Sequence, residues 1–109
     1  SQHILYFFAP WCNVCRHSMS NLQEFSENNA DISVKAIALS YGAVEEVSQF
    51  ASDLELSMPV LLGNNQVMEA YKIKGFPTYY VVNAKGQVTA RSMGYSTKAG
   101  ISLRALLNR

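Results

Sequence analysis

Short apolar segments alternate along the chain with segments that have helical periodicity. Five segments rich in aliphatic, aromatic or β-branched residues predict β-strands: Ile4–Phe8, Val34–Leu39, Pro59–Leu62, Thr78–Val82 and Gln87–Met93. Between them, apolar residues recur at spacings of three and four, which is typical of helices with one buried face. Four helices are predicted. The first follows Pro10 and has an apolar face of Val14, Met19, Leu22 and Phe25, and the second opens at Gly42. The third covers Gln66–Tyr71, and the fourth runs from a cap at Ser96 or Thr97 to about Leu107.

The order of these elements predicts an α/β fold. Strand–helix–strand crossovers require parallel strands, whereas the turn Asn83–Gly86, with glycine at the position that needs positive φ, predicts an antiparallel hairpin. We therefore expect one domain over residues 1–109, with a mixed sheet covered by helices on both faces. The first helix begins directly after the first strand, so it opens at the carboxyl edge of the sheet, where open α/β sheets place their sites.

Composition and charge exclude several classes of protein. The 109 residues carry a net charge of +1, with 49% hydrophobic and 16% charged residues, which is typical of a chain that buries a core rather than of a disordered one. The chain has no run of basic residues that would indicate a nucleic-acid partner, and no apolar stretch approaches the ~20 residues of a membrane span. The chain has no signal-peptide pattern. The first predicted strand starts almost at the first residue, from which we expect a longer parent protein.

The only two cysteines are separated by two residues, in Cys12-Asn13-Val14-Cys15, at the start of the first predicted helix. Free N–H groups and the helix dipole favour an anion at that end, and thiols placed there ionise more readily. A thiolate at Cys12 can attack a disulfide, and Cys15, buried one turn further, can then attack the resulting mixed disulfide. The motif predicts a redox-active dithiol that needs no cofactor.

Other interpretations of the dithiol have less support. A structural disulfide across two residues constrains little of the unfolded chain. A zinc site needs about four ligands, and only His3 and His17 could join the cysteines. Covalent haem requires histidine directly after the second cysteine, where Arg16 stands. A copper-binding or copper-delivery module that uses the two thiolates, and a scaffold domain with an incidental dithiol, stay open as alternatives. We assign no metal ligand.

Three residues near Cys12 in the sequence could contribute to the chemistry of the dithiol. Trp11 could shield the nucleophile and offer an apolar platform to a partner, or it could be a core aromatic residue. Arg16 lies four residues after Cys12 on the same helix face, where it could stabilise a thiolate or simply be solvated. His17 points away from Cys12, because five residues along a helix do not share a face, so we assign it no role.

The segment Phe8–Cys15, followed some sixty residues later by Gly75-Phe76-Pro77-Thr78, resembles the thioredoxin superfamily. The region between the two motifs is similar to the TlpA/ResA-like group of extracytoplasmic, often membrane-tethered thiol–disulfide oxidoreductases. The resemblance implies that Cys12 attacks, Cys15 resolves, and Pro77 is a cis-proline facing the dithiol. It also implies that the backbone of Phe76 is ready to hold an extended substrate segment.

The resemblance further implies protein thiol or disulfide substrates, a redox partner protein, reductive rather than oxidative work, and a periplasmic or other extracytoplasmic location. A membrane tether would precede Ser1. The sequence also departs from the family pattern. Tyr6 stands where thioredoxin has a buried aspartate, and Tyr41-Gly42 stand near the position at which some ResA-like proteins keep a glutamate. The nearest carboxylates, Glu45 and Glu46, belong to the next helix, so we expect the usual proton-relay acid to be missing or replaced.

Overall fold

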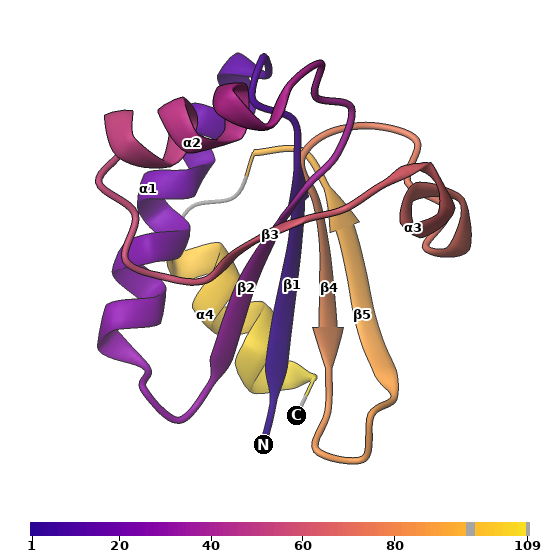
Figure 1. Cartoon of the computed structure of the whole chain (residues 1–109). Helices are drawn as coiled ribbons and strands as arrows, with labels where there is room; N and C mark the ends of the chain where they lie inside the picture. Colours follow the sequence, from indigo (N-terminus) through magenta and orange to yellow (C-terminus); the bar gives the residue numbers. More distant parts are fainter. Residues whose placement is uncertain (96–97, 109) are drawn as a thin grey trace.

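A computed structural model describes residues 1–95 and 98–108 and shows a five-stranded mixed sheet with helices (Figure 1). The sheet order is β3-β2-β1-β4-β5, in which β1 pairs parallel with β2 and antiparallel with β4. The elements are β1 (His3–Phe8), α1 (Asn13–Asn28), β2 (Ser33–Ala38), α2 (Val44–Asp53), β3 (Val60–Leu62), α3 (Asn65–Ala70), β4 (Thr78–Val82), β5 (Val88–Met93) and α4 (Lys98–Leu107).

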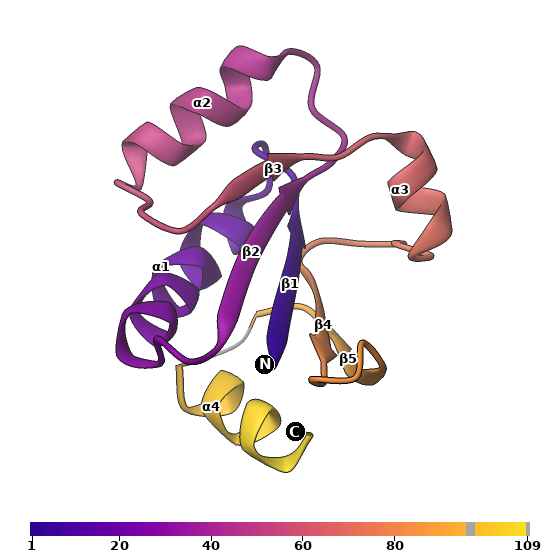
Figure 2. The ribbon, with the colours of Figure 1, turned by 60° about the horizontal axis from the view of Figure 1, so that its bottom comes forward.

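Helices cover both faces of the sheet, as the sequence predicts (Figure 2). On one face, α1, α2 and α4 enclose the larger apolar cluster, in which Phe8 of β1 stacks on Phe50 of α2 with ring centroids 4.7 Å apart. On the other face, α3 lies over a smaller cluster whose buried members are Phe7, Ile37, Leu39, Ile73 and Tyr80. Alternate residues of β1 therefore feed two separate cores, which makes β1 the central support of the fold.

The predicted elements are all present, and their ends differ from the prediction by at most two residues. The second helix begins at Val44 rather than at Gly42, because the Glu46 carboxylate accepts hydrogen bonds from the backbone N–H groups of Gly42 (3.3 Å) and Ala43 (3.1 Å). These bonds close the helix start at Ala43. Gly86 has the expected positive φ of 78°. The predicted caps Ser96 and Thr97 lie outside the described residues.

The site is positioned by the short connection from β1 to α1. After Phe8, the chain makes one turn in which the backbone N–H of Cys12 donates to the carbonyl of Ala9 at 3.1 Å, and α1 starts at Asn13. The carbonyl of Phe8 accepts from Leu39, just beyond the end of β2, at 2.8 Å. Cys12 is thereby fixed at the carboxyl edge of the central strand, as predicted.

Candidate active site

Cys12 is the N-cap residue of α1. Its backbone is extended (φ −87°, ψ 113°), and its sulfur accepts the backbone N–H of Cys15 at 3.2 Å. The sulfur therefore occupies the place of the serine or aspartate oxygen that usually caps a helix, at the positive end of the helix dipole. Only 9% of Cys12 is exposed, and both cysteines are free thiols. The Cys12 sulfur thus completes the first turn of α1 as its cap.

Cys15 lies one turn further along α1 and is fully buried. Burial raises the pKa of the Cys15 thiol far above its ordinary value of 9.0, and the hydrogen bond with Cys12 raises it further. At neutral pH, Cys15 therefore holds its proton, whereas Cys12 lies outside the first helical turn, at its cap. The two thiols of one motif are set up for different steps of an exchange reaction.

The loop before β4 lies against the dithiol. The Phe76–Pro77 peptide bond is cis, as predicted, and the Cys12 thiol donates to the Phe76 carbonyl across 3.8 Å. Neighbouring bonds fix this loop: the Thr78 hydroxyl donates to the Gly75 carbonyl at 2.8 Å, and the Gly94 N–H donates to the Pro77 carbonyl at 2.9 Å. The structure thus brings together two motifs that lie 64 residues apart in the chain.

Trp11 lies on the surface beside Cys12 and is not a core residue. Its side chain is 62% exposed, its indole N–H donates to the Ser40 carbonyl at 2.7 Å, and its ring meets Phe76 edge to face at 5.8 Å between centroids. The hydrogen bond ties the indole to the loop after β2, where Ser40 has a positive φ of 53°. The Trp11 ring thus packs beside Phe76, whose carbonyl accepts a hydrogen bond from the Cys12 thiol.

Arg16 turns toward α2. Its guanidinium lies 4.9 Å from the centre of the Phe50 ring and 3.8 Å from the carboxylate of Asp53. The ion pair is exposed at both ends and so adds little stability, but the stacking covers Phe50. Arg16 therefore packs α1 against α2, which is neither of the roles considered from the sequence. His17 is exposed, as its place on the helix suggests.

The two tyrosines that the sequence comparison with the family pattern singled out, Tyr6 and Tyr41, both bond to backbone carbonyls. The hydroxyl of Tyr6 lies 3.0 Å from the Cys15 carbonyl and 2.7 Å from the hydroxyl of Ser18, inside the core. The hydroxyl of Tyr41 donates to the Gly63 carbonyl at 2.7 Å. Sequence reasoning did not include Ser18. Ser18 stands three residues after Cys15, on the same helix face, and this spacing could have indicated that the two residues are neighbours.

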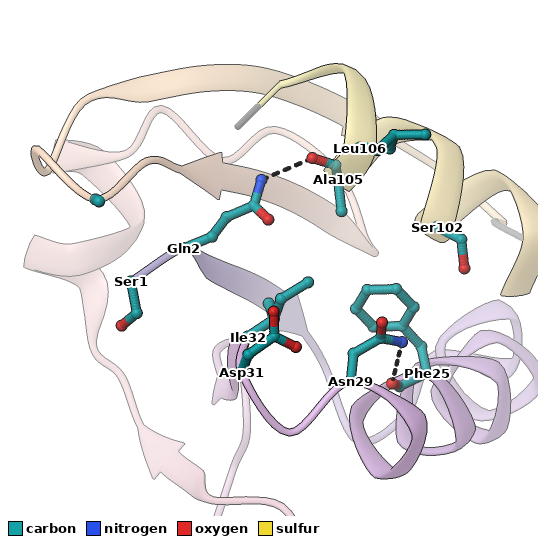
Figure 3. A pocket seen from close by; sticks show the side chains of 10 residues that line it. Ser1, Gln2, Phe25, Asn29, Asp31, Ile32, Ser102, Ala105 and Leu106 are labelled. Atoms are coloured by element: carbon teal, nitrogen blue, oxygen red, sulfur yellow. Dashed lines mark hydrogen bonds between the residues drawn. The ribbon is translucent and has the colours of Figure 1, made fainter.

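The structure was also searched for pockets, metal sites and membrane-spanning helices away from the dithiol. A pocket of about 730 Å³ lies at the amino end of β1, where Gln2 donates to the Ala105 carbonyl at 2.8 Å (Figure 3). Within residues 1–95 and 98–108, no group of three or more His, Cys, Asp or Glu side chains could hold a metal ion. No helix in this part of the chain has the length and apolar character needed to cross a membrane.

The buried Cys15 thiol predicts a pH dependence of stability. Its pKa in the folded protein lies above the unfolded value, so the native state keeps a proton that the unfolded chain loses above about pH 9. The stabilisation is complete below that pH and falls as the pH rises. We expect the free energy of unfolding of the reduced protein to fall by about 1 kcal/mol from pH 8 to pH 10, measured by urea denaturation. Cys15→Ala should lose less over the same range, and identical pH curves for the two proteins would refute the assignment.

Comparisons with known proteins agree with this geometry. The sequence profile of the AhpC/TSA family matches residues 1–91. Sporulation thiol-disulfide oxidoreductase A of Bacillus subtilis is 27% identical over 99 residues, which cover 86% of this chain and 60% of that protein. Thiol-disulfide oxidoreductase ResA of Oceanobacillus iheyensis is 31% identical over 87 residues, which cover 78% of this chain and 45% of that protein. The chain thus spans about half the length of these curated relatives.

A solved structure shares the fold. The crystal structure of a secreted Mycobacterium tuberculosis disulfide oxidoreductase homologous to E. coli DsbE superposes with a TM-score of 0.85 at 20% identity, covering 97% of this chain and 81% of that one. The fold is therefore thioredoxin-like. With the family profile matching most of its length, this chain belongs to the AhpC/TSA family, and it is similar to proteins named thiol-disulfide oxidoreductase ResA.

Proposed function

We propose that this chain is a thiol–disulfide oxidoreductase that exchanges disulfides with protein substrates through Cys12 and Cys15. The observation that carries the proposal is the position of the Cys12 sulfur, which caps α1 through the Cys15 N–H and faces the Phe76 carbonyl. The names of the two curated relatives, both thiol-disulfide oxidoreductases, support the same activity.

In the first step, the Cys12 thiolate attacks one sulfur of a substrate disulfide. The Cys12–substrate bond forms while the substrate S–S bond breaks, and the other substrate sulfur leaves as a thiolate that takes a proton from solvent. The Cys15 N–H, 3.2 Å from the Cys12 sulfur, stabilises the attacking thiolate. Cys12 is the residue for this step because it lies at the helix end and, unlike Cys15, keeps part of its surface exposed.

In the second step, Cys15 attacks the Cys12 sulfur. The Cys12–Cys15 disulfide forms, the bond to the substrate breaks, and the proton of Cys15 ends on the departing substrate thiol. The substrate has then gained two electrons and the protein has lost them. A redox partner with a dithiol of its own is needed to reduce the Cys12–Cys15 disulfide for another cycle. The short spacing allows this bond to close within one helical turn.

The surroundings of Cys12 suit an extended substrate segment. In the free protein, the Phe76 carbonyl accepts a hydrogen bond from the Cys12 thiol. With a substrate bound, it would instead accept a hydrogen bond from a backbone N–H of the substrate. Trp11, Phe76 and Pro77 would line this segment, with the exposed indole of Trp11 supplying apolar contact area. A shallow pocket of about 420 Å³ next to Trp11 and Arg16 leaves room for a neighbouring substrate side chain.

The proposed setting is extracytoplasmic, and the proposed direction is reductive. The resemblance to the TlpA/ResA-like group supports both, and the similar M. tuberculosis protein is described as secreted. In this setting, residues before Ser1 would carry a membrane tether, and the partner protein would deliver electrons to the Cys12–Cys15 disulfide.

Serine variants test the division of labour between the cysteines. Cys12→Ser should reduce insulin-disulfide reduction to the uncatalysed background, because the attacking sulfur is gone. Cys15→Ser should complete the first step and accumulate a mixed disulfide at Cys12, detected by mass spectrometry under non-reducing conditions. Ser20→Ala, at an exposed position of the same helix, should keep full turnover. Turnover by Cys12→Ser at a rate near that of the wild type would refute the proposal.

The reduction potential of the Cys12–Cys15 couple tests the direction. A reductant should have a value closer to the about −270 mV of thioredoxin than to the about −120 mV of the oxidant DsbA. Equilibration in dithiothreitol redox buffers, followed by the fluorescence of Trp11, gives this value. A variant in which both cysteines are serine should show no transition. A potential near −120 mV would contradict the reductive direction and leave the exchange chemistry intact.

A further inference from the structure

The pocket beside Trp11 lies next to the residue proposed as the nucleophile. Its volume of about 420 Å³ is within the range of roughly 300–1,000 Å³ that ligand pockets occupy. It is lined by Pro10, Trp11, Arg16, Glu45, Glu46 and Gln49. Trp11 is joined to Cys12 by one peptide bond, and the backbone N–H of Arg16 donates to the Cys12 carbonyl at 3.2 Å. A substrate whose disulfide reaches Cys12 therefore has its neighbouring residues close to this pocket.

The positive charge in the pocket is already balanced. Among the described residues that line the pocket, Arg16 alone is a cation. Its guanidinium lies 3.8 Å from the Asp53 carboxylate and 4.9 Å from the centre of the Phe50 ring, and both partners belong to α2. Because Asp53 offsets its charge, Arg16 does not make the pocket attractive to an anion.

Two carboxylates from the first turn of α2 give the pocket a negative charge. Glu46 is held in place, because its carboxylate accepts the N–H of Ala43 at 3.1 Å and would lie 2.7 Å from a side-chain carbon added at Gly42. Glu45 is exposed and makes no hydrogen bond or ion pair within the part of the chain that the structure describes. The N-terminus of a helix contributes roughly half a positive charge, so the two carboxylates leave a net charge of roughly −1.5.

The remaining lining adds an aromatic surface and a hydrogen-bond acceptor. Trp11 is 62% exposed and its indole N–H is bonded to the Ser40 carbonyl, so its ring offers apolar and π surface. Gln49 donates to the Asp53 carboxylate at 2.6 Å, which leaves its own side-chain carbonyl as an acceptor. Carboxylates beside an exposed indole suit an arginine or lysine side chain, which packs its aliphatic stem on apolar surface and its charge on carboxylates and π faces.

We propose that this pocket selects substrates with an arginine or lysine side chain next to the disulfide, and that Glu45 determines this preference. The inference rests on the proposed exchange function, because the pocket acts only while a substrate disulfide is held at Cys12. The aliphatic stem of the basic side chain would lie along the Trp11 ring, and its charged head would reach the Glu45 carboxylate. An acidic side chain at the same place would meet like charge and be disfavoured.

The test uses three disulfide-linked dimers of a short peptide with one cysteine. The peptides are identical except for the two residues that flank the cysteine, which are both arginine, both glutamine or both glutamate. Each reduction converts one peptide disulfide to two peptide thiols and forms the Cys12–Cys15 disulfide, so two electrons pass from the protein to the peptide. Chromatography of the acid-quenched peptide thiol gives each rate constant. Dividing it by the rate constant with dithiothreitol removes the effect of peptide charge on the disulfide itself.

The wild-type protein should reduce the arginine peptide about fivefold faster than the glutamine peptide, in line with a partly exposed ion pair assisted by an aromatic ring. The glutamate peptide should be the slowest of the three. Glu45→Gln should lose most of the preference for arginine, and Glu45→Lys should reduce the glutamate peptide faster than the arginine peptide. Raising the ionic strength from about 0.02 M to about 0.5 M should weaken the wild-type preference, because salt screens exposed charges.

Glu27→Gln is the matched control, because it removes the same charge at an exposed position near the other end of α1. Fifteen residues of helix at 1.5 Å each place this position roughly 22 Å from Cys12. Glu27→Gln should therefore keep the wild-type preference.

Equal rates of the wild-type protein with the arginine and glutamate peptides would overturn the inference. A full preference for arginine in Glu45→Gln, or a lost preference in Glu27→Gln, would overturn it as well, because the selectivity would then lie outside this pocket. A wild-type protein that reduces none of the three peptides would overturn the exchange function itself, and the role of Glu45 with it. Its rate with the glutamine peptide thus distinguishes the two failures.

Discussion

The hydrogen bond from the Cys15 N–H to the Cys12 sulfur is the interaction on which the site depends. It can form only because β1 ends at Phe8 and the chain turns at once into α1, so that residue 12 becomes the helix cap. Helix caps are normally oxygen atoms that accept backbone N–H groups. Here a thiol does so, and the same geometry that completes the helix also prepares a nucleophile.

The cap also explains why two chemically identical side chains act differently. Cys12 stands before the first helical turn and keeps part of its surface exposed, whereas Cys15 is inside that turn and fully buried. The Phe76 carbonyl, before the cis bond to Pro77, accepts a hydrogen bond from the Cys12 thiol, and Trp11 bonds to the loop after β2. Two segments that are distant in the sequence thus contact the short connection that carries Trp11 and Cys12.

Much of this arrangement could be predicted from the sequence, because the relevant signals are local. The periodicity indicated every element, and β4 was predicted with its actual bounds Thr78–Val82. The Cys12–Cys15 spacing identified the dithiol, and the resemblance pointed to the cis bond at Pro77. These features are encoded within a few consecutive residues or in a motif.

The remainder depends on tertiary contacts that no local pattern contains. Trp11 could have been core or surface, and its side chain is 62% exposed, with its indole N–H bonded to the Ser40 carbonyl. Arg16 pairs with α2 because Phe50 lies beneath it, which the spacing from Cys12 could not reveal. Tyr6 was noticed only as a departure from the family pattern. Its contact with Ser18 joins a strand to a helix and is visible only when both are packed.

The start of α1 divides the two thiols into a nucleophile at the helix cap, 9% exposed, and a resolving group inside the first turn that is fully buried. Alkylation of the reduced, folded protein with iodoacetamide at pH 7, followed by mass mapping of each cysteine, measures this division directly. We predict that Cys12 is modified at least about tenfold faster than Cys15, and that the difference disappears in urea. Equal rates for the two cysteines in the folded protein would contradict the claim.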